Sequence, residues 1–381
     1  MNFVSSKVNT YNMKATILIP LLFLSVLIFG CSNSPVNAET EELVIVKESL
    51  VSEQFLKEDI GLAPYVIGPY LLIKQDQNLP ENVVFKVYNA SDLGYLGDIG
   101  VRGREGPDTF YGANYWGQYV ERDGDYLIWV NDPPRFRMSL INITKSHQEG
   151  KTVIERKVMH KPEYDFMNAL FVVDSSGLVG HQPGYHDGTN MAPLVMLKNG
   201  EFQLYGEYPE VNNIMDEKRW DNGATFNRVT LSMKPDQSRF AVAMDHYDRL
   251  DIFDSNGQLI SSFRDPEKYA LYNYSDIFTA SAGIPRQYRD YYTSAASTQD
   301  LLFIIYEDIS VEEAREFHPS TIRVFDWDGN LKAELACPDQ IWNISVDEEK
   351  GYLYAGSSQQ EALFRYDIKS VLNRLLEKQV D

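Results

Sequence analysis

The feature that most constrains the fold of this chain is a repeated alternation of short apolar runs and polar turns. The pattern is clearest in residues 240–263, FAVAMDHYDRLDIFDSNGQLISSF. Apolar residues alternate with small ones up to Met244, return at Leu250, and return again after the turn 254–257. A period of two bounded by Asx-Gly turns is typical of antiparallel strands joined by tight hairpins. Asn256-Gly257 accepts positive φ at low cost, so this turn can close with the twist of the sheet.

Comparable groups of apolar runs recur along the chain. The expected strands lie at 65–74, 83–88 and 93–99; 115–119, 126–130, 135–143 and 153–158; 170–174, 178–180, 194–197 and 202–205; 229–233 and the runs of 240–263; 292–296, 301–306, 321–326 and 331–335; and 341–346, 351–355 and 363–368. In three groups the third strand ends in an aromatic residue followed by aspartate, at Phe253-Asp254, Phe325-Asp326 and Tyr366-Asp367. Self-similar units of about 40–50 residues with four short strands indicate propeller blades. We therefore predict an all-β fold, a six-bladed β-propeller.

The two ends of the chain are expected to complete the propeller. The last group has only three clear strands, whereas Leu43–Val46 is an apolar run without a local partner. We predict that Leu43–Val46 pairs with Leu363–Ile368 and closes the last blade, which removes two free sheet edges. A short C-terminal helix over 367–380 is expected to cap the propeller, because its apolar residues share one face: Ile368, Val371, Leu372 and Leu375. A helix that binds a partner is the alternative.

The N-terminal segment has the composition of a targeting signal. Lys14 precedes an apolar run over 17–29, which is too short to span a bilayer comfortably and is typical of a signal-peptide core. The run ends at Gly30-Cys31, which resembles the processing site of bacterial lipoproteins. This predicts a signal peptide at 1–30, a flexible tether at 31–42 and a propeller at 43–381. An ordinary cleaved signal or a short anchor is the alternative, and either Met1 or Met13 is the true start.

If this resemblance holds, lipid on the sulfur and amine of Cys31 would anchor the protein to a membrane. Several acyl chains, each contributing about 0.8 kcal/mol per buried CH₂, bind a bilayer durably. Loss of 1–30 would remove two lysines and no acidic residue, which takes the formal net charge from −20 to −22. Such acidity disfavours nucleic acid and anionic surfaces as partners. Cys337 is the only other cysteine, so an internal disulfide is not expected, and we predict that its side chain is a buried or half-buried hydrophobic group.

One phrase suggests a family. Residues 95–110 read YLGDIGVRGREGPDTF, with Gly100, Gly103 and Gly106-Pro107 followed by the aromatic Phe110. This resembles the Gly-rich phrase after the first blade of TolB-like six-bladed propeller lipoproteins of Bacteroidetes-type bacteria. The present phrase has one extra residue and carries Asp108-Thr109 in place of the usual Gly-Glu. The resemblance implies a fold and an envelope location, and it does not imply an activity.

The Gly-rich phrase allows two interpretations. As a structural element it is a crossover between blades, in which glycines permit positive φ and Pro107 stiffens the exit. As a functional element, its amide N–H groups together with Arg102 and Arg104 would hold an anion such as a carboxylate or phosphate. The structural interpretation is favoured.

Signatures of enzymes and metal sites are weak. The sequence contains no G-x-S-x-G, S-x-x-K or H-E-x-x-H motif. His181, His186 and Asp187 share one loop, but a metal site would need both rings turned together and a further ligand from elsewhere. Residues 326–330 resemble the start of a calcium loop, although the expected glutamate does not follow at EF-hand spacing and a hairpin turn explains the pattern. We predict no catalytic residue, no bound metal and no cofactor.

Aromatic-rich loops are the better functional signal, because each precedes the first strand of a blade. Residues in that position fall at one mouth of the central channel, where several blades converge. Tyr, Trp, Arg and Asn together suit sugars or peptides. Rings wedged between blades are the alternative. With the two arginines of the Gly-rich phrase, the candidate ligand-binding residues are Arg102, Arg104, Tyr115, Trp116, Trp220, Asn222, Arg228, Arg289 and Tyr291.

The leading hypothesis is a lipid-anchored, extracytoplasmic propeller that binds a ligand or protein partner (a sugar or a peptide) at its channel mouth, without catalysis. We expect a monomer in the bacterial cell envelope, periplasmic or surface-exposed, with the outer membrane favoured. The first alternative is an envelope hydrolase or lactonase-like enzyme that uses a metal ion in the central channel. The second is a propeller that only supports a partner subunit.

Overall fold

The computed structural model describes residues 45–56, 63–75, 82–161, 168–173, 177–182, 192–198, 200–208, 227–265, 289–310 and 312–377. These residues belong to the compact unit Leu43–Asp381. The expected signal peptide and tether, with Cys31, lie outside the described residues. No helix in the described part of the chain has the length and hydrophobicity needed to cross a membrane.

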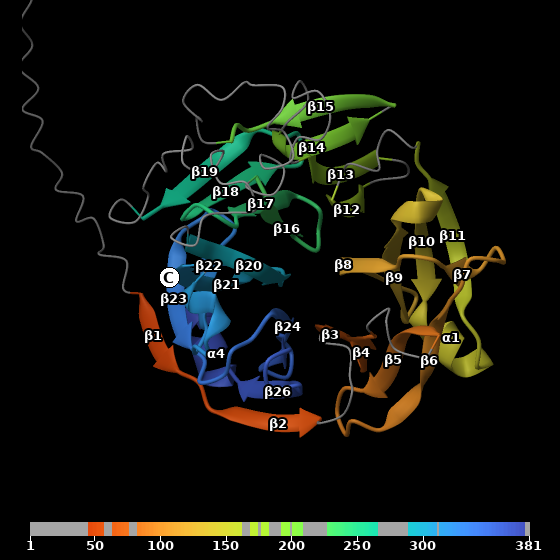
Figure 1. Cartoon of the computed structure of the whole chain (residues 1–381), viewed down its shortest axis with the longest axis horizontal. Helices are drawn as coiled ribbons and strands as arrows, with labels where there is room; N and C mark the ends of the chain where they lie inside the picture. The colour runs from red at the N-terminus through yellow and green to blue at the C-terminus, as the bar shows by residue number, and fades with distance from the viewer. Residues whose placement is uncertain are drawn as a thin grey trace, which may run out of the picture. The chain divides into compact units, whose positions relative to one another are not determined.

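The strands of this unit form six small sheets arranged as the blades of a wheel (Figure 1). Blade 1 contains β3 (Ala63–Ile67), β4 (Tyr70–Lys74), β5 (Val83–Asn89), β6 (Tyr95–Arg102) and β7 (Thr109–Phe110); blade 2 contains β8 (Asn114–Arg122), β9 (Asp125–Asp132), β10 (Arg137–Asn142) and β11 (Val153–Met159). Blade 3 contains β12 (Asn168–Val173), β13 (Gly177–Gln182), β14 (Ala192–Lys198) and β15 (Glu201–Tyr205); blade 4 contains β16 (Val229–Met233), β17 (Arg239–Met244), β18 (Arg249–Asp254) and β19 (Leu259–Arg264). Blade 5 contains β20 (Arg289–Ser297), β21 (Leu301–Ser310), β22 (Thr321–Asp326), β23 (Leu331–Ala336) and β1 (Val46–Ser49); blade 6 contains β24 (Asn343–Asp347), β25 (Tyr352–Ser357), β26 (Ala362–Asp367) and β2 (Ser52–Leu56). The predicted six-bladed β-propeller is confirmed.

Helices are few in the described part of the chain. They are the 3₁₀ turns η1 (Pro133–Arg135) and η4 (Glu313–Arg315) and the α-helices α1 (Ile143–Glu149) and α4 (Lys369–Glu377). Helix α1 is capped at its N-terminus by Asn142, whose side chain accepts a hydrogen bond from the Lys145 amide, and at its C-terminus by Gly150 in the left-handed region.

The hydrophobic core lies between the blades, as strand β17 illustrates. Phe240 and Val242 pack in a cluster with the apolar residues of blade 3, whereas Ala241 and Ala243 pack in a cluster with those of blade 5. Successive side chains of a strand point to opposite faces, and both faces of this strand are covered. The alternation in the sequence is therefore one of large and small residues rather than apolar and polar ones.

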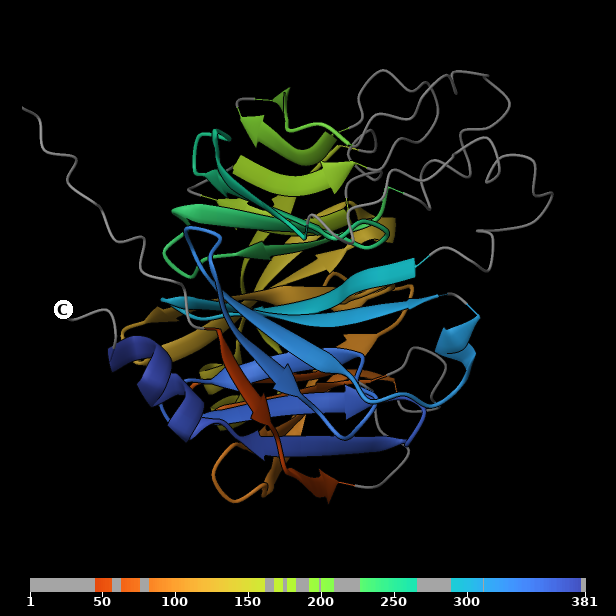
Figure 2. The same ribbon diagram turned by 90° about the vertical axis from the view of Figure 1, so that its left-hand side faces the viewer.

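An N-terminal strand closes the last blade, but its residues are not the ones expected from the sequence. Strand β2 pairs antiparallel with β26, with Ser52 opposite Tyr366, and this strand completes blade 6. Strand β1 instead pairs parallel with β23 of blade 5, with Val46 opposite Ala333 (Figure 2). The prediction that an N-terminal strand closes the last blade is confirmed, and its assignment to Leu43–Val46 is wrong. The reason is that β2 is a solvent-facing outer strand, which needs no apolar pattern and leaves little trace in the sequence.

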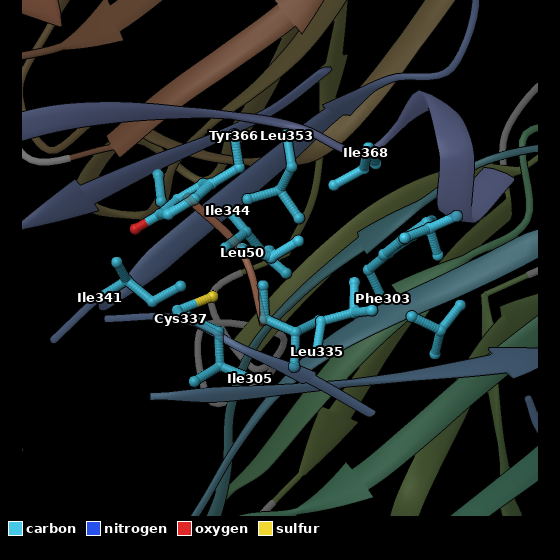
Figure 3. Close-up of a cluster of buried hydrophobic side chains, with 14 of the residues drawn as sticks. Leu50, Phe303, Ile305, Leu335, Cys337, Ile341, Ile344, Leu353, Tyr366 and Ile368 are labelled. Atoms are coloured by element: carbon cyan, nitrogen blue, oxygen red, sulfur yellow. The ribbon is translucent and has the colours of Figure 1, made fainter. Parts of the chain in front are cut away.

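The first and last segments of the described chain meet in one hydrophobic cluster between blades 5 and 6 (Figure 3). Leu50, between β1 and β2, is buried in this cluster, and its amide donates to the Ala336 carbonyl at 2.8 Å. The predicted C-terminal helix is confirmed as α4, which contributes its buried apolar face to the same cluster: Val371, Leu372 and Leu375. Cys337 is buried there as predicted, and burial raises the pKa of its thiol.

Candidate functional site: the central channel

A cavity of about 800 Å³ runs through the centre of the wheel and is lined by residues of all six blades. The first strand of each blade faces it: β3, β8, β12, β16, β20 and β24 (Figure 1). Hydrogen bonds between neighbouring blades show that the starts of these strands lie together at one end of the cavity and their ends at the other. Lys74 Nζ, beside the start of β3, donates to Asn114 Oδ1 at the start of β8, at 3.3 Å. Thr298 Oγ1, after the end of β20, donates to Glu348 Oε1 after the end of β24, at 3.3 Å. The cavity therefore has two distinct mouths.

We call the mouth at the starts of the inner strands the N-mouth and the mouth at their ends the C-mouth. The N-mouth is defined by Lys74, Asn114, Tyr115, Trp116, His181, Arg228, Asp245, Trp342 and Asn343. The C-mouth is defined by Gly68, Glu121, Tyr126, Pro235, Gln299, Asp347, Glu348 and Glu349.

Side-chain hydrogen bonds link the inner strands of neighbouring blades. Each of these hydrogen bonds joins a side chain of one blade to the backbone of the next, which satisfies backbone groups that no sheet partner reaches. They are Tyr65 Oη to the Tyr115 carbonyl at 3.1 Å, the Val66 amide to Ser345 Oγ at 2.9 Å, and Ser297 Oγ to the Met233 carbonyl at 2.8 Å.

An irregularity in β8 shapes the N-mouth. Tyr115 lies opposite Val130 and Tyr119 lies opposite Ile128, so the three residues between them face a single residue of β9. Gly117 makes this bulge possible with a φ of +85°. Bulges re-aim side chains, and here the two residues that flank Gly117 have separate environments.

Gln118 and Trp116 illustrate this separation. Gln118 is buried and reaches blade 3, where its Nε2 donates to the Val172 carbonyl at 2.6 Å and its Oε1 accepts from the Val172 amide at 2.8 Å. Trp116 lines the cavity and remains 43% exposed. A second tryptophan, Trp342, lies just before β24, lines the same cavity and is 47% exposed. The N-mouth therefore displays two large aromatic rings.

The basic lining residues of the described chain gather at the N-mouth. Lys74 and Arg228 line the cavity there, together with one carboxylate, Asp245. Arg228 Nη2 contacts Asp245 Oδ2 at 3.2 Å. Burial raises the pKa of Asp245 to about 6, against the opposing effect of the Arg228 charge. The Asp245 carbonyl accepts from the Tyr291 amide at 2.7 Å, which connects this site to blade 5.

The C-mouth is acidic. Glu121, Asp347, Glu348 and Glu349 line it, and the described lining residues at this end include no lysine or arginine. Burial raises the pKa of Glu348, and the pKa of Tyr119 is raised by burial and by the nearby Glu121 and Glu348. Asp347 accepts from the Lys350 amide at 3.0 Å and from Lys350 Nζ at 3.0 Å, so at least this carboxylate also serves a hairpin turn.

Three of the predicted ligand-binding residues meet in the cavity: Tyr115, Trp116 and Arg228. Tyr115 is buried in its wall, whereas the other two side chains are exposed. Trp220 and Asn222 lie outside the described residues. Sequence reasoning missed Trp342, although it stands just ahead of an inner strand, the position that identified the other candidates. It also missed Asp245, which no local pattern marks.

The remaining four candidates do not line the cavity. Arg102 donates to the carbonyls of Gln75 and Val83, and Arg104 lies over the Tyr111 ring at 5.2 Å. Arg289 pairs with Asp308, with Nε 2.8 Å from Oδ1, and Tyr291 is buried in the cluster formed by blades 4 and 5.

Within the Gly-rich phrase, carbonyl groups face cations. Arg135 donates to the carbonyls of Gly103 at 2.9 Å and Gly106 at 2.7 Å, and Arg137 donates to the Pro107 carbonyl at 2.7 Å. Strand β7 then pairs parallel with β6. These contacts support the interpretation of the phrase as a crossover held by arginines of blade 2.

Of the two weak metal patterns, the one at 326–330 lies wholly within the described residues and the histidine pattern only in part. Within the described ranges, no group of three His, Cys, Asp or Glu side chains could hold a metal ion. His181 lines the cavity, while His186 and Asp187 lie outside the described residues. At 326–330, Asp326 Oδ1 accepts from the amides of Asp328 at 3.0 Å and Asn330 at 2.9 Å. These bonds support the hairpin-turn interpretation of that segment.

No protein-family model and no curated protein matches the chain. Among solved structures, it is similar to a member of the DUF4221 family from Bacteroides vulgatus, with 15% identity, coverage of 85% of this chain and 97% of that chain, and a TM-score of 0.50. A Bacteroides fragilis protein proposed to be exported aligns with 11% identity over 84% of this chain and 98% of its own, with a TM-score of 0.48. At such identities the similarity concerns the fold. The fold and the lined central cavity together define the chain as a six-bladed β-propeller with an accessible channel.

Proposed function

We propose that this chain is a lipid-anchored, non-catalytic binding protein of the bacterial cell envelope, and that a sugar or a peptide binds at its N-mouth. The observation that carries the proposal is the exposure of Trp116 inside a concave cavity, beside a bulge whose other side is fixed by Gln118.

The chemistry of the N-mouth fits such a ligand. A cavity of about 800 Å³ falls within the range of roughly 300–1,000 Å³ typical of ligand pockets. Tryptophan rings offer flat apolar faces that pack on sugar rings or peptide side chains. Asn114, Asn343 and Lys74 add polar groups that would fix the orientation of a ligand. The wall behind them is held by bonds between blades, so little ordering is required on binding.

A direct test is to screen the protein with neutral oligosaccharides and short uncharged peptides by ligand-observed NMR. Hits are then titrated against the wild type and Trp116→Ala. We expect the substitution to weaken binding at least about tenfold, because stacking on an aromatic face is lost. Phe317→Ala is the matched control, since Phe317 is 52% exposed and does not line the cavity. Equal affinity of Trp116→Ala and the wild type would refute the N-mouth as the binding site.

Membrane anchoring is supported by the apolar run 17–29 and by Gly30-Cys31. Cells expressing the full chain are labelled with a fatty-acid analogue, and the membrane fraction is compared with that of cells expressing Cys31→Ser. The wild type is expected to carry the label and to remain with membranes, and the variant to lose both properties. Cys337→Ser is the control, because Cys337 is buried in the propeller. A labelled, membrane-bound Cys31→Ser protein would contradict lipidation at this residue.

A further inference from the structure

The N-mouth contains one ion pair whose two members differ sharply in exposure. Arg228 immediately precedes β16 and Asp245 immediately follows β17, so the hairpin places them side by side. Their side chains are 63% and 9% exposed, respectively, and Nη2 of Arg228 lies 3.2 Å from Oδ2 of Asp245. The carboxylate therefore lies in the wall of the channel, and the guanidinium lies over it at the cavity surface.

The Arg228–Asp245 ion pair uses only part of the hydrogen-bonding capacity of each side chain. Within the described residues, Arg228 makes this single ion pair, and Asp245 Oδ1 has no hydrogen-bond partner. A guanidinium presents five N–H donors, and its planar edges match a carboxylate with two parallel bonds. One end of Arg228 is thus held by the protein, while donors remain for a ligand. An arginine held in this way loses less rotamer freedom on binding than an unrestrained one.

We propose that Arg228 binds the carboxylate of a ligand in the N-mouth, with Asp245 as the positioning residue that holds the guanidinium. This inference rests on the proposed function and specifies the class of ligand: one with a carboxylate close to a ring or side chain that packs on Trp116. An acidic sugar and the C-terminus of a peptide share this chemistry.

The arrangement favours an anion over a cation. A cationic ligand would have to displace Arg228 to reach Asp245, whose side chain is only 9% exposed. An anion meets Arg228 directly, and the Lys74 ammonium lines the same mouth. In a chain with a formal net charge of −20, a basic mouth provides local attraction that the rest of the surface does not.

Protonation of Asp245 is coupled to this binding. The charged and titratable groups that face Asp245 are Arg228, the adjacent His246, Asp290 of β20 and Tyr208 after β15, while His181 lines the same cavity. Burial raises the pKa of Asp245 to about 6, and an anion at Arg228 would raise it further. A ligand carboxylate with an ordinary pKa of about 3.5 stays ionised at pH 5. Affinity is therefore expected to increase as the pH falls from about 7.5 to about 5.

The experiment compares acids with their neutral counterparts on the folded protein. The probes are trigalacturonate and its methyl ester, and a tetrapeptide with a free C-terminus and its C-terminal amide. Each is titrated at pH about 5 and about 7.5 by calorimetry. We expect at least one acid to bind roughly tenfold or more tightly than its neutral counterpart, as charge-assisted hydrogen bonds allow. The arm that shows this preference identifies the source of the carboxylate.

Three variants assign the effect to residues. Arg228→Gln is expected to remove the preference for the acid at both pH values. Asp245→Asn is expected to keep the preference and to flatten its pH dependence, because the amide is isosteric with the protonated acid. Arg264→Gln is the control, since Arg264 lies on the outer strand β19 of the same blade and outside the cavity lining.

Equal affinity for each acid and its neutral counterpart, binding of neither acid, or an unchanged preference in Arg228→Gln would overturn the carboxylate site. Loss of binding in Asp245→Asn with retention in Arg228→Gln would also overturn it, in favour of a cation. Neutral probes that bind in a Trp116-dependent manner, without preference for the acid, would refute this inference and leave the proposed function standing.

Discussion

The two mouths of the channel are built on opposite ends of the same six strands, and they differ in the source of their side chains. The C-mouth is formed by hairpins between the first and second strands of a blade, such as the turn from Asp347 to Tyr352. The N-mouth is formed where the chain enters a blade, at residues such as Arg228 and Trp342. Aspartate, such as Asp347, favours tight turns because its side-chain oxygens accept nearby amide hydrogens. The negative charge of the C-mouth therefore follows partly from the residues that its turns require. The charged residues of the N-mouth have no such role in a turn and are available to bind a ligand.

This comparison predicts opposite pH responses for two carboxylates, Asp245 at the N-mouth and Asp236 in the turn beside the C-mouth. At the N-mouth, the folded pKa of Asp245 is about 6, above its reference value of 3.8. The stability that this group contributes is then fully present below about pH 4 and lost as the pH rises through 6, which amounts to about 3 kcal/mol. Asp245→Asn should not show this loss, so its stability relative to wild type should increase from pH 4 to pH 7 in urea unfolding. A constant difference across this range would contradict the prediction.

The next largest effect concerns the wall of the N-mouth. Gln118→Ala removes both hydrogen bonds to Val172 and leaves a buried amide and carbonyl unpaired. The free energy of unfolding should fall by about 2–3 kcal/mol, and ligand binding should weaken because Trp116 loses its support. Gln299→Ala is the matched change at the C-mouth, where the exposed Gln299 donates to Asp236 Oδ2 at 2.9 Å. Gln299→Ala should lower the free energy of unfolding by less than about 0.5 kcal/mol. Similar losses of stability in the two variants would contradict the difference between the mouths.

A smaller effect than those at Asp245 and Gln118 is expected at Asp236, in the turn that follows Pro235 of the C-mouth. Burial raises the pKa of Asp236, but hydrogen bonds from Ser238 and Gln299 outweigh it and lower the pKa to about 2. Its contribution to stability is present above the reference value of 3.8 and lost as the pH falls through 2. Asp236→Asn should therefore destabilise the protein at neutral pH by less than about 1 kcal/mol, since solvent screens the group. A gain in stability at neutral pH would contradict the assignment of this carboxylate to turn structure.

The sequence predicted the blades because the second strand of most blades is buried on both faces. Runs such as 240–244 and 301–306 have few alternatives to a strand once hairpin turns bound them. It did not predict β2, since an outer strand facing solvent leaves no apolar pattern. Arg228 was found because it stands before an inner strand. Its partner Asp245 was not found, because the pairing across a hairpin depends on register, which the sequence of one strand does not contain.

The wheel is joined by residues from opposite ends of the polypeptide. Glu53 of β2 and Arg365 of β26 interact across 312 positions of sequence. During synthesis, β2 emerges early but must wait for β26, the last strand, so the ring stays open until nearly the whole chain is available. A force applied to the chain before β1 would first load the pairing between β1 and β23 in blade 5. The junction of blades 5 and 6 is thus the last contact to form as the ring closes. It is also the first to bear a mechanical force applied from the N-terminal side.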